Sequence, residues 1–260
     1  ALNASKVANG LISYMLKDNP EIGVTTSTVN PLVLECNDGS ISQTQNRVLD
    51  ESNVLEAIKN ASDDFLEGAI GAGTGMRCNG FKSGIGSSSR VIKIKDKEYV
   101  IGVLVNSNYG ASNGSELIFN GRRLGGLIKD YNLAHEEDKG SIIIVVATNA
   151  PLDNRQLKRL AKRTELGVAR TGSYGGHGSG DVMVAFSTAN KVLQSPSYME
   201  DTVVRFSDAY LNSFFKATVD ATEEAILNSM LYAKPMKSYN GTEYKSLMEY
   251  RELFEDLLEK

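Results

Sequence analysis

Residues 140–146, GSIIIVV, constrain the fold of this 260-residue chain more than any other stretch. Five consecutive β-branched residues follow a glycine and a serine, and a short apolar run bounded by turn residues is typical of a buried strand. Two interpretations of the junction are open. Gly140 and Ser141 form only a loop that enters a strand, or the serine is placed so that the chain can be cut just before it.

The rest of the chain mixes helical and strand patterns. Apolar periodicity predicts helices over 5–18, 52–67 and 201–232, and a further helix that begins near Asp153. Strands are expected over 31–36, in two runs within 90–110, after Ser141 and over 181–190. Because strands and helices do not alternate strictly, the pattern favours an α+β layer fold over a doubly wound sheet. No composition shift marks a domain boundary.

Composition excludes several classes of function. A net charge of −4 argues against a nucleic-acid-binding protein, which would present a basic face. No apolar run approaches the roughly 20 residues of a membrane helix. Cys36 and Cys78 are too few for a zinc cluster or a disulfide framework, and we expect two buried thiols. With His135 and His177 as the only histidines, a histidine-based catalytic site is poorly supported.

Three segments bring small polar residues to the end of a strand. Residues 68–90 are rich in glycine but match neither nucleotide-binding fingerprint, which favours a loop where backbones approach closely or where a substrate lies against exposed N–H groups. Residues 169–186 bring Ser179 and Asp181 to a strand, and 103–111 place Asn108 just after one. Each residue alone is a common turn former, yet strand ends are also where scaffolds present catalytic groups.

A nucleophilic serine requires a base. Without a well-placed histidine, the other available base is an α-amino group, whose ordinary pKa near 8 leaves part of it neutral at pH 7. Such an amine exists beside the Ser141 hydroxyl only if the Gly140–Ser141 bond is cut. This links the junction at 140–141 to catalysis.

Several motifs, in a fixed order, resemble those of the L-aminopeptidase/D-esterase family, which includes the DmpA-type and β-peptidyl aminopeptidases. The similar stretches cover nearly the whole chain and are GTGMRCNGFKSGIGSSSR, IGVLVNSNYG, KGSIIIVVATNAPLDNRQLKRLAKRTELGVARTGS, GSGDVMVAFSTAN and ATEEAILNSM.

The resemblance implies a fold and a processing event. The fold would be a single-domain, four-layer αββα sandwich similar to that of N-terminal-nucleophile hydrolases and ornithine acetyltransferase. Self-cleavage would divide residues 1–260 into an α chain, 1–140, and a β chain, 141–260. The αβ units would form homotetramers, with no metal and no organic cofactor.

By position, the resemblance makes Ser141 the nucleophile and its freed amine the base. Asn108 would stabilise the oxyanion, and Ser179 and Asp181 would orient the nucleophile and its amine. Glu35 would lie near the substrate's amino group. Asn37 departs from the Tyr-Asp-Gly of relatives, which affects the expected substrate range.

The expected activity is an aminopeptidase, amidase or esterase acting on small peptides, amides or esters, with neither nucleic acid nor membrane as a partner. We expect a cytoplasmic protein. Because family members carry a further segment ahead of the position of Ala1, a periplasmic or secreted location is also compatible with the sequence. Two alternatives remain: an acyltransferase of the ornithine acetyltransferase type, and an inactive binding homologue.

Overall fold

The computed structural model describes residues 2–128, 139–192, 199–200 and 202–258. The helices are α1 (Ala4–Asp18), α2 (Glu51–Lys59), α3 (Asn154–Arg170), α4 (Leu211–Leu231) and α5 (Glu255–Leu258). The strands are β1 (Arg77–Cys78), β2 (Phe81–Lys82), β3 (Ile85–Ile94), β4 (Lys97–Asn108), β5 (Ile118–Phe119), β6 (Arg122–Arg123), β7 (Lys139–Thr148), β8 (Gly178–Ser187), β9 (Met236–Lys237) and β10 (Glu243–Tyr244). Short 3₁₀ turns are η1 (Thr44–Asn46), η2 (Gly71–Gly73), η3 (Asp208–Tyr210) and η4 (Leu247–Leu253).

One four-stranded sheet organises the described chain. Its strand order is β3-β4-β7-β8, with the first two pairs antiparallel and β7 parallel to β8. The expected strand after Ser141 is therefore a central strand. Ile142, Ile144 and Val146 are fully buried on one face of it, as the β-branched run predicts.

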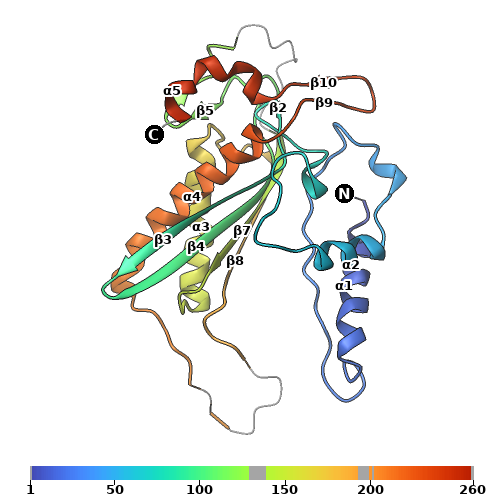
Figure 1. Ribbon diagram of the computed structural model, residues 1–260, viewed down its shortest axis with the longest axis vertical. Helices are drawn as coiled ribbons and strands as arrows, with labels where there is room; N and C mark the ends of the chain where they lie inside the picture. Colours follow the sequence, from blue (N-terminus) through green and yellow to red (C-terminus); the bar gives the residue numbers. More distant parts are fainter. Residues whose placement is uncertain (1, 129–138, 193–198, 201, 259–260) are drawn as a thin grey trace.

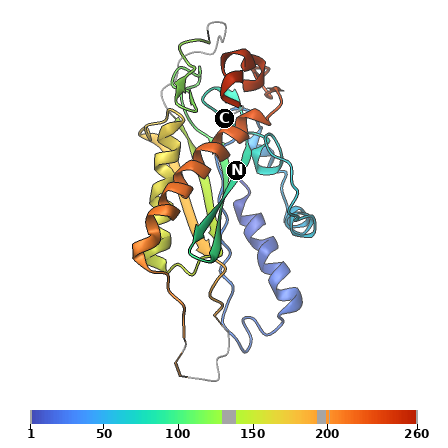
Figure 2. The ribbon, with the colours of Figure 1, turned by 60° about the vertical axis from the view of Figure 1, so that its left-hand side comes forward.

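The helices α3 and α4 cover one face of this sheet, and the N-terminal segment with α1 and α2 lies on the other side (Figures 1 and 2). Helix α4 approaches β3 closely where the strand has Gly86. A Cβ atom at Gly86 would lie 1.9 Å from the carbonyl oxygen of Ala225, so only glycine allows this contact. Asp153 caps the N-terminus of α3, near the predicted start. Its carboxylate accepts from the backbone N–H of Gln156, and its own backbone N–H donates to Gln156 Oε1.

The face turned away from α3 and α4 bears exposed apolar side chains. They are Val91, Val100, Leu104, Val182 and Phe186, which are 37–59% exposed. We call this set the open apolar face. The α+β class is confirmed. An αββα sandwich has two sheets between two helical layers; the described residues contain one large sheet and one helical layer on it, formed by α3 and α4.

Three predicted elements differ in the structure. Residues 31–36 pair with no strand among the described residues; instead Leu34 and Cys36 pack on Met76 and Ile143. The second helix ends at Lys59, because the residues that follow, NASDD, favour turns over helix. The long helix begins only at Leu211, after the turn η3.

Candidate active site

The end of one strand and the starts of two others lie together at one end of the main sheet. Each of these strands carries a residue that the sequence analysis predicted to be functional. Asn108, the last residue of β4, pairs with Ser141 near the start of β7. On the other side of β7, Ser141 pairs with Gly180 and Gly140 pairs with Ser179 of β8. Residues far apart in the sequence therefore meet around the Gly140–Ser141 bond.

The junction itself requires glycine. Gly140 has φ +136°, and a Cβ atom there would lie 2.0 Å from the carbonyl oxygen of Asn108. Any other residue would have to adopt a left-handed backbone against a backbone atom, which is strongly disfavoured. The backbone immediately before Ser141 is thus held in a conformation that ordinary residues avoid.

The Ser141 hydroxyl lies in a dry environment. Its oxygen is buried and makes no hydrogen bond of standard geometry within the described residues. The Cys36 thiol is its neighbour: burial raises the pKa of that thiol to about 11, and the Ser141 hydroxyl opposes the rise. Cys36 is therefore a neutral thiol at pH 7, and it packs with Met76 and Ile143.

The carboxamide of Asn108 is held from both ends. The backbone N–H of Arg77 donates to Asn108 Oδ1 at 3.2 Å, and Asn108 Nδ2 donates to the carbonyl oxygen of Asn37 at 3.0 Å. Because a backbone N–H can only donate, the Arg77 bond fixes which end of the amide is the acceptor. Asn108 thus presents its donor end at the same strand end as Ser141.

Ser179 and Asp181 form a pair on β8. The Ser179 hydroxyl donates to Asp181 Oδ1 at 2.6 Å. No hydrogen bond from either side chain to Ser141 occurs among the described residues.

Glu35 and Asn37 lie on the segment that covers this edge. The Glu35 carboxylate is exposed but near enough to raise the pKa of the Cys36 thiol. The side chain of Asn37 accepts from the N–H of Gly39 at 3.0 Å, and its backbone carbonyl accepts from Asn108 Nδ2 at 3.0 Å.

Two residues near the site escaped the sequence analysis. Cys36 was expected only as a buried thiol, and both cysteines are indeed free and buried. Lys82 lies in the glycine-rich run NGFKSGIG. A single charged residue inside such a run was the feature of the sequence that could have indicated a buried lysine. Its side chain is fully buried beneath the glycine-rich loop 73–76.

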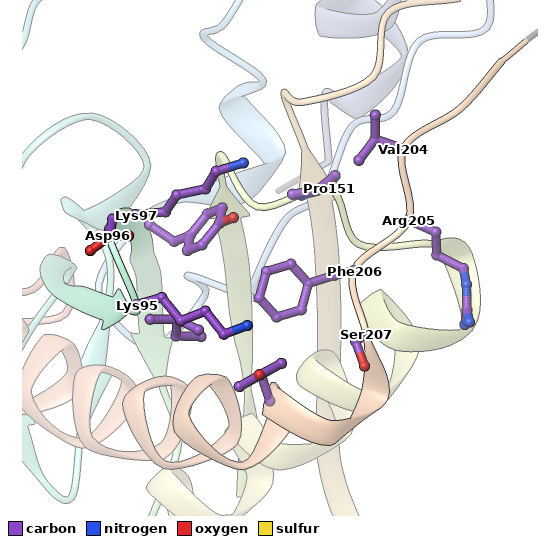
Figure 3. A pocket seen from close by; sticks show the side chains of 11 residues that line it. Lys95, Asp96, Lys97, Pro151, Val204, Arg205, Phe206 and Ser207 are labelled. Carbon is purple, nitrogen blue, oxygen red and sulfur yellow. The ribbon is translucent and has the colours of Figure 1, made fainter.

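A depression of about 390 Å³ lies elsewhere, beside the turn between β3 and β4 (Figure 3). Tyr99, Phe206 and Tyr210 line it together with Lys95. Since β4 runs from Lys97 to Asn108, this depression is about 36 Å along the strand from the residues around Ser141. It is separate from the candidate active site.

Neither a metal cluster nor a membrane span was found in the part of the chain that the structure describes. No three His, Cys, Asp or Glu side chains are grouped there as metal ligands. No described helix is long and apolar enough to cross a membrane.

Comparison with known sequences gives close relatives. Residues 1–244 match the model of peptidase family S58. The beta-peptidyl aminopeptidase of Sphingosinicella microcystinivorans is 39% identical over 226 residues, which are 81% of this chain and 57% of that protein. The beta-peptidyl aminopeptidase of Sphingosinicella xenopeptidilytica is 32% identical over 251 residues, 92% of this chain and 62% of that protein. The chain thus spans about six tenths of the length of these relatives.

Solved structures give the same result. A Pyrococcus horikoshii OT3 protein matches with a TM-score of 0.91 and 43% identity, over 98% of this chain and 71% of that one. The L-aminopeptidase D-Ala-esterase/amidase of Ochrobactrum anthropi, described as a variant of the Ntn hydrolase fold, matches with a TM-score of 0.87, 31% identity and the same coverage. The resemblance to the L-aminopeptidase/D-esterase family is confirmed, and the chain belongs to peptidase family S58.

Proposed function

We propose that the protein is a self-processing aminopeptidase, with amidase and esterase activity, whose nucleophile is Ser141. The observation that supports this most directly is the position of Ser141. Ser141 lies between Asn108 and Gly180 in the sheet, directly after a glycine with φ +136°, and its buried hydroxyl has only the Cys36 thiol as a polar neighbour and no hydrogen bond of standard geometry among the described residues. A buried hydroxyl without a strong hydrogen-bond partner, next to the carbonyl of a glycine whose backbone conformation other residues avoid, is suitably placed for internal attack.

The processing step forms and breaks one bond each. Ser141 Oγ attacks the carbonyl carbon of Gly140, the C–N bond to Ser141 breaks, and the hydroxyl proton moves to the departing nitrogen. Water then hydrolyses the resulting ester. The products are a carboxylate on Gly140 and an α-amine on Ser141, which supplies the base that the sequence otherwise lacks.

Turnover uses the same groups. The α-amine accepts the proton of the Ser141 hydroxyl, which attacks the substrate carbonyl. The Nδ2 group of Asn108 has two N–H bonds, and only one is needed for the carbonyl of Asn37, so the other can donate to the developing oxyanion. The protonated amine then releases the leaving group, and water frees the acyl-enzyme.

Ser179 and Asp181 orient the Ser141 region in this proposal, and Glu35 receives the substrate's amino group. The exposed carboxylate of Glu35 and the Ser179–Asp181 hydrogen bond support these roles. Small peptides, amides and esters are the substrates that fit the chemistry. The mature form is proposed to be a homotetramer of αβ units, which light scattering on the purified protein would test.

Hydrolysis is favoured over acyl transfer because the two curated relatives are aminopeptidases. The decisive experiment combines processing with turnover. Denaturing electrophoresis should show two bands, and sequencing of the fragment that starts at the cut should read Ser-Ile-Ile-Ile. An aminoacyl p-nitroanilide should be hydrolysed equally fast with and without an acetyl acceptor. A single intact band from active protein would overturn the mechanism. Absence of any turnover would favour the alternative that the protein is an inactive binding homologue.

A further inference from the structure

Lys82 is a buried lysine whose amino group has no carboxylate partner among the described residues. Its side chain is fully inaccessible, and Nζ donates to three carbonyl oxygens, those of Gly73 at 3.1 Å, Met76 at 2.8 Å and Ser83 at 2.6 Å. Burial lowers its pKa to about 7. Lysine is rarely buried in this way, and neutral carbonyls compensate the lost hydration only in part. An arrangement so costly to the fold suggests a use for the charge.

One of these three carbonyls leads directly to the candidate active site. The carbonyl of Met76 and the N–H of Arg77 belong to the same peptide unit, which is planar and conjugated. Lys82 Nζ donates to the oxygen of this unit, and its N–H donates to Asn108 Oδ1 at 3.2 Å. The amide of Asn108 then donates from Nδ2. Two amide groups in series therefore connect a buried ammonium to the proposed oxyanion donor.

Such a series has a direction. A positive charge on the oxygen side of a peptide unit strengthens its N–H as a donor, and hydrogen bonds in a chain polarise one another. The same effect then acts across the carboxamide of Asn108, from Oδ1 to Nδ2. The polarisation is largest where the surroundings are dry, and Asn108 is only 7% exposed.

We infer that Lys82 is a positioning residue that acts on Asn108 through the Met76–Arg77 peptide unit. It holds loop 73–76 so that the Arg77 N–H fixes the orientation of the Asn108 amide, and its charge strengthens Asn108 Nδ2 as a donor. The importance of this for catalysis rests on the proposed role of Asn108 as the oxyanion donor.

A double-mutant cycle tests the inference. In the processed enzyme, Lys82→Met should lower kcat about tenfold, a part of the roughly 10²–10³ that an oxyanion donor contributes, with KM little changed. In the Asn108→Ala background the same substitution should have almost no further effect on kcat, since the group through which it acts is gone. An equal loss of kcat in both backgrounds would overturn the inference.

Two further variants separate this role from simple loss of packing. Lys82→Gln keeps a donor without the charge, so it is expected to fold more readily than Lys82→Met and to show the same dependence on Asn108. Ser83→Ala is the matched control: it removes a buried hydrogen bond to the Ser107 carbonyl in the same segment but leaves the Lys82 contacts in place. Any effect of Ser83→Ala on kcat should be the same with and without Asn108.

A measurement on the unmutated side chains remains if the Lys82 variants do not fold. In ¹⁵N-labelled protein titrated from pH 6 to 11, the Arg77 N–H and Asn108 Nδ2 signals should shift with the same midpoint as Lys82 Nζ. Signals that ignore the ionisation of Lys82 would overturn the inference. This readout needs no turnover, so it decides about Lys82 even if Asn108→Ala shows that Asn108 is not the oxyanion donor.

Discussion

Ser141 and Lys82 both place a polar side chain out of reach of water, and the fold treats them in opposite ways. Lys82 has three hydrogen-bond acceptors, whereas the Ser141 hydroxyl has no hydrogen bond of standard geometry within the described residues and only the Cys36 thiol as a polar neighbour. An unsatisfied buried hydroxyl is energetically unfavourable unless a partner arrives later. The amine freed by cleavage before Ser141 would be such a partner.

The oxyanion role proposed for Asn108 predicts a specific kinetic signature. Asn108→Ala should lower kcat by about 10²–10³, because the bond from Nδ2 strengthens mainly in the transition state. KM should change far less. Steady-state kinetics on an aminoacyl p-nitroanilide measures both, and a rise in KM with kcat intact would make Asn108 a binding or turn residue instead.

The Ser179–Asp181 pair predicts a difference between two variants. A carboxylate near an amine raises the pKa of the amine, so Asp181→Asn should shift the acidic limb of the kcat/KM profile to lower pH. Ser179→Ala should impair processing and turnover more than Asp181→Asn, because it removes the hydroxyl that both steps would use. Unchanged pH profiles and near-normal rates in both variants would show that residues 175–181 form only a turn that leads into the strand and have no catalytic role.

Lys82 also predicts how stability depends on pH. Its folded pKa of about 7 lies below the ordinary value of 10.5, so the unfolded chain binds more protons between these values. The free energy of unfolding should therefore rise with pH, by about 2–3 kcal/mol from pH 7 to 9. Above pH 9 Cys36 opposes the trend, because its folded pKa is raised. Urea unfolding of the uncut Ser141→Ala variant measures the slope, and Lys82→Met in that background should lack it.

At the scale of elements, the site depends on how strands are paired rather than on any single motif. Strand β7 is antiparallel to β4 and parallel to β8, so the end of one and the starts of the other two share an edge. Helix α3 connects β7 to β8 and packs against α4.

The contact of α4 with β3 gives a prediction about Gly86. Gly86→Ala would place a methyl group 1.9 Å from the Ala225 carbonyl oxygen and 2.9 Å from Ser229 Cβ. The helix would have to move, at a cost of about 2 kcal/mol in unfolding free energy. Gly102→Ala is the control. Gly102 lies on the neighbouring strand β4, and none of the surrounding atoms lies within 4 Å of a methyl group added there. Equal denaturation midpoints for the two variants would contradict the close contact.

At the scale of the whole molecule, the main sheet is asymmetric. One face is buried by α3 and α4; the other is covered near Ile143 by Leu34 and Cys36 and elsewhere carries the open apolar face defined above, whose side chains are exposed by up to 59%. Contiguous apolar patches of this kind normally meet another protein surface.

The 260-residue chain expressed by itself should therefore bind the dye anilinonaphthalene sulfonate through this face. Replacing Val100 and Phe186 together by threonine should lower the dye fluorescence markedly and reduce self-association. Val48→Thr is the control, since Val48 is 80% exposed but lies outside the sheet. Fluorescence that falls equally in the control and the double variant would place the dye elsewhere.

Local patterns in the sequence were enough for several elements. The run of β-branched residues after Ser141 specified a buried strand, and the cap at Asp153 specified the start of α3, because both signals lie within a few residues of one another. The strand expected over 31–36 and the long extension of the second helix were wrong. Apolar runs there pack through side chains, and the ladder partner that a strand requires cannot be read from a single segment.

By itself, the sequence determined which residue types stand at strand ends, and through its resemblance it determined the family. Only the tertiary structure decided that Asn108, Ser141 and Gly180 are neighbours in one sheet, because strand pairing joins Asn108 to Ser141, 33 residues later, and Ser141 to Gly180, 39 residues later. It alone also decided that the charge of Lys82 is buried and that its Nζ contacts the peptide unit that holds Asn108. A side chain's solvation and hydrogen-bond partners depend on what surrounds it in space, and sequence spacing does not encode that.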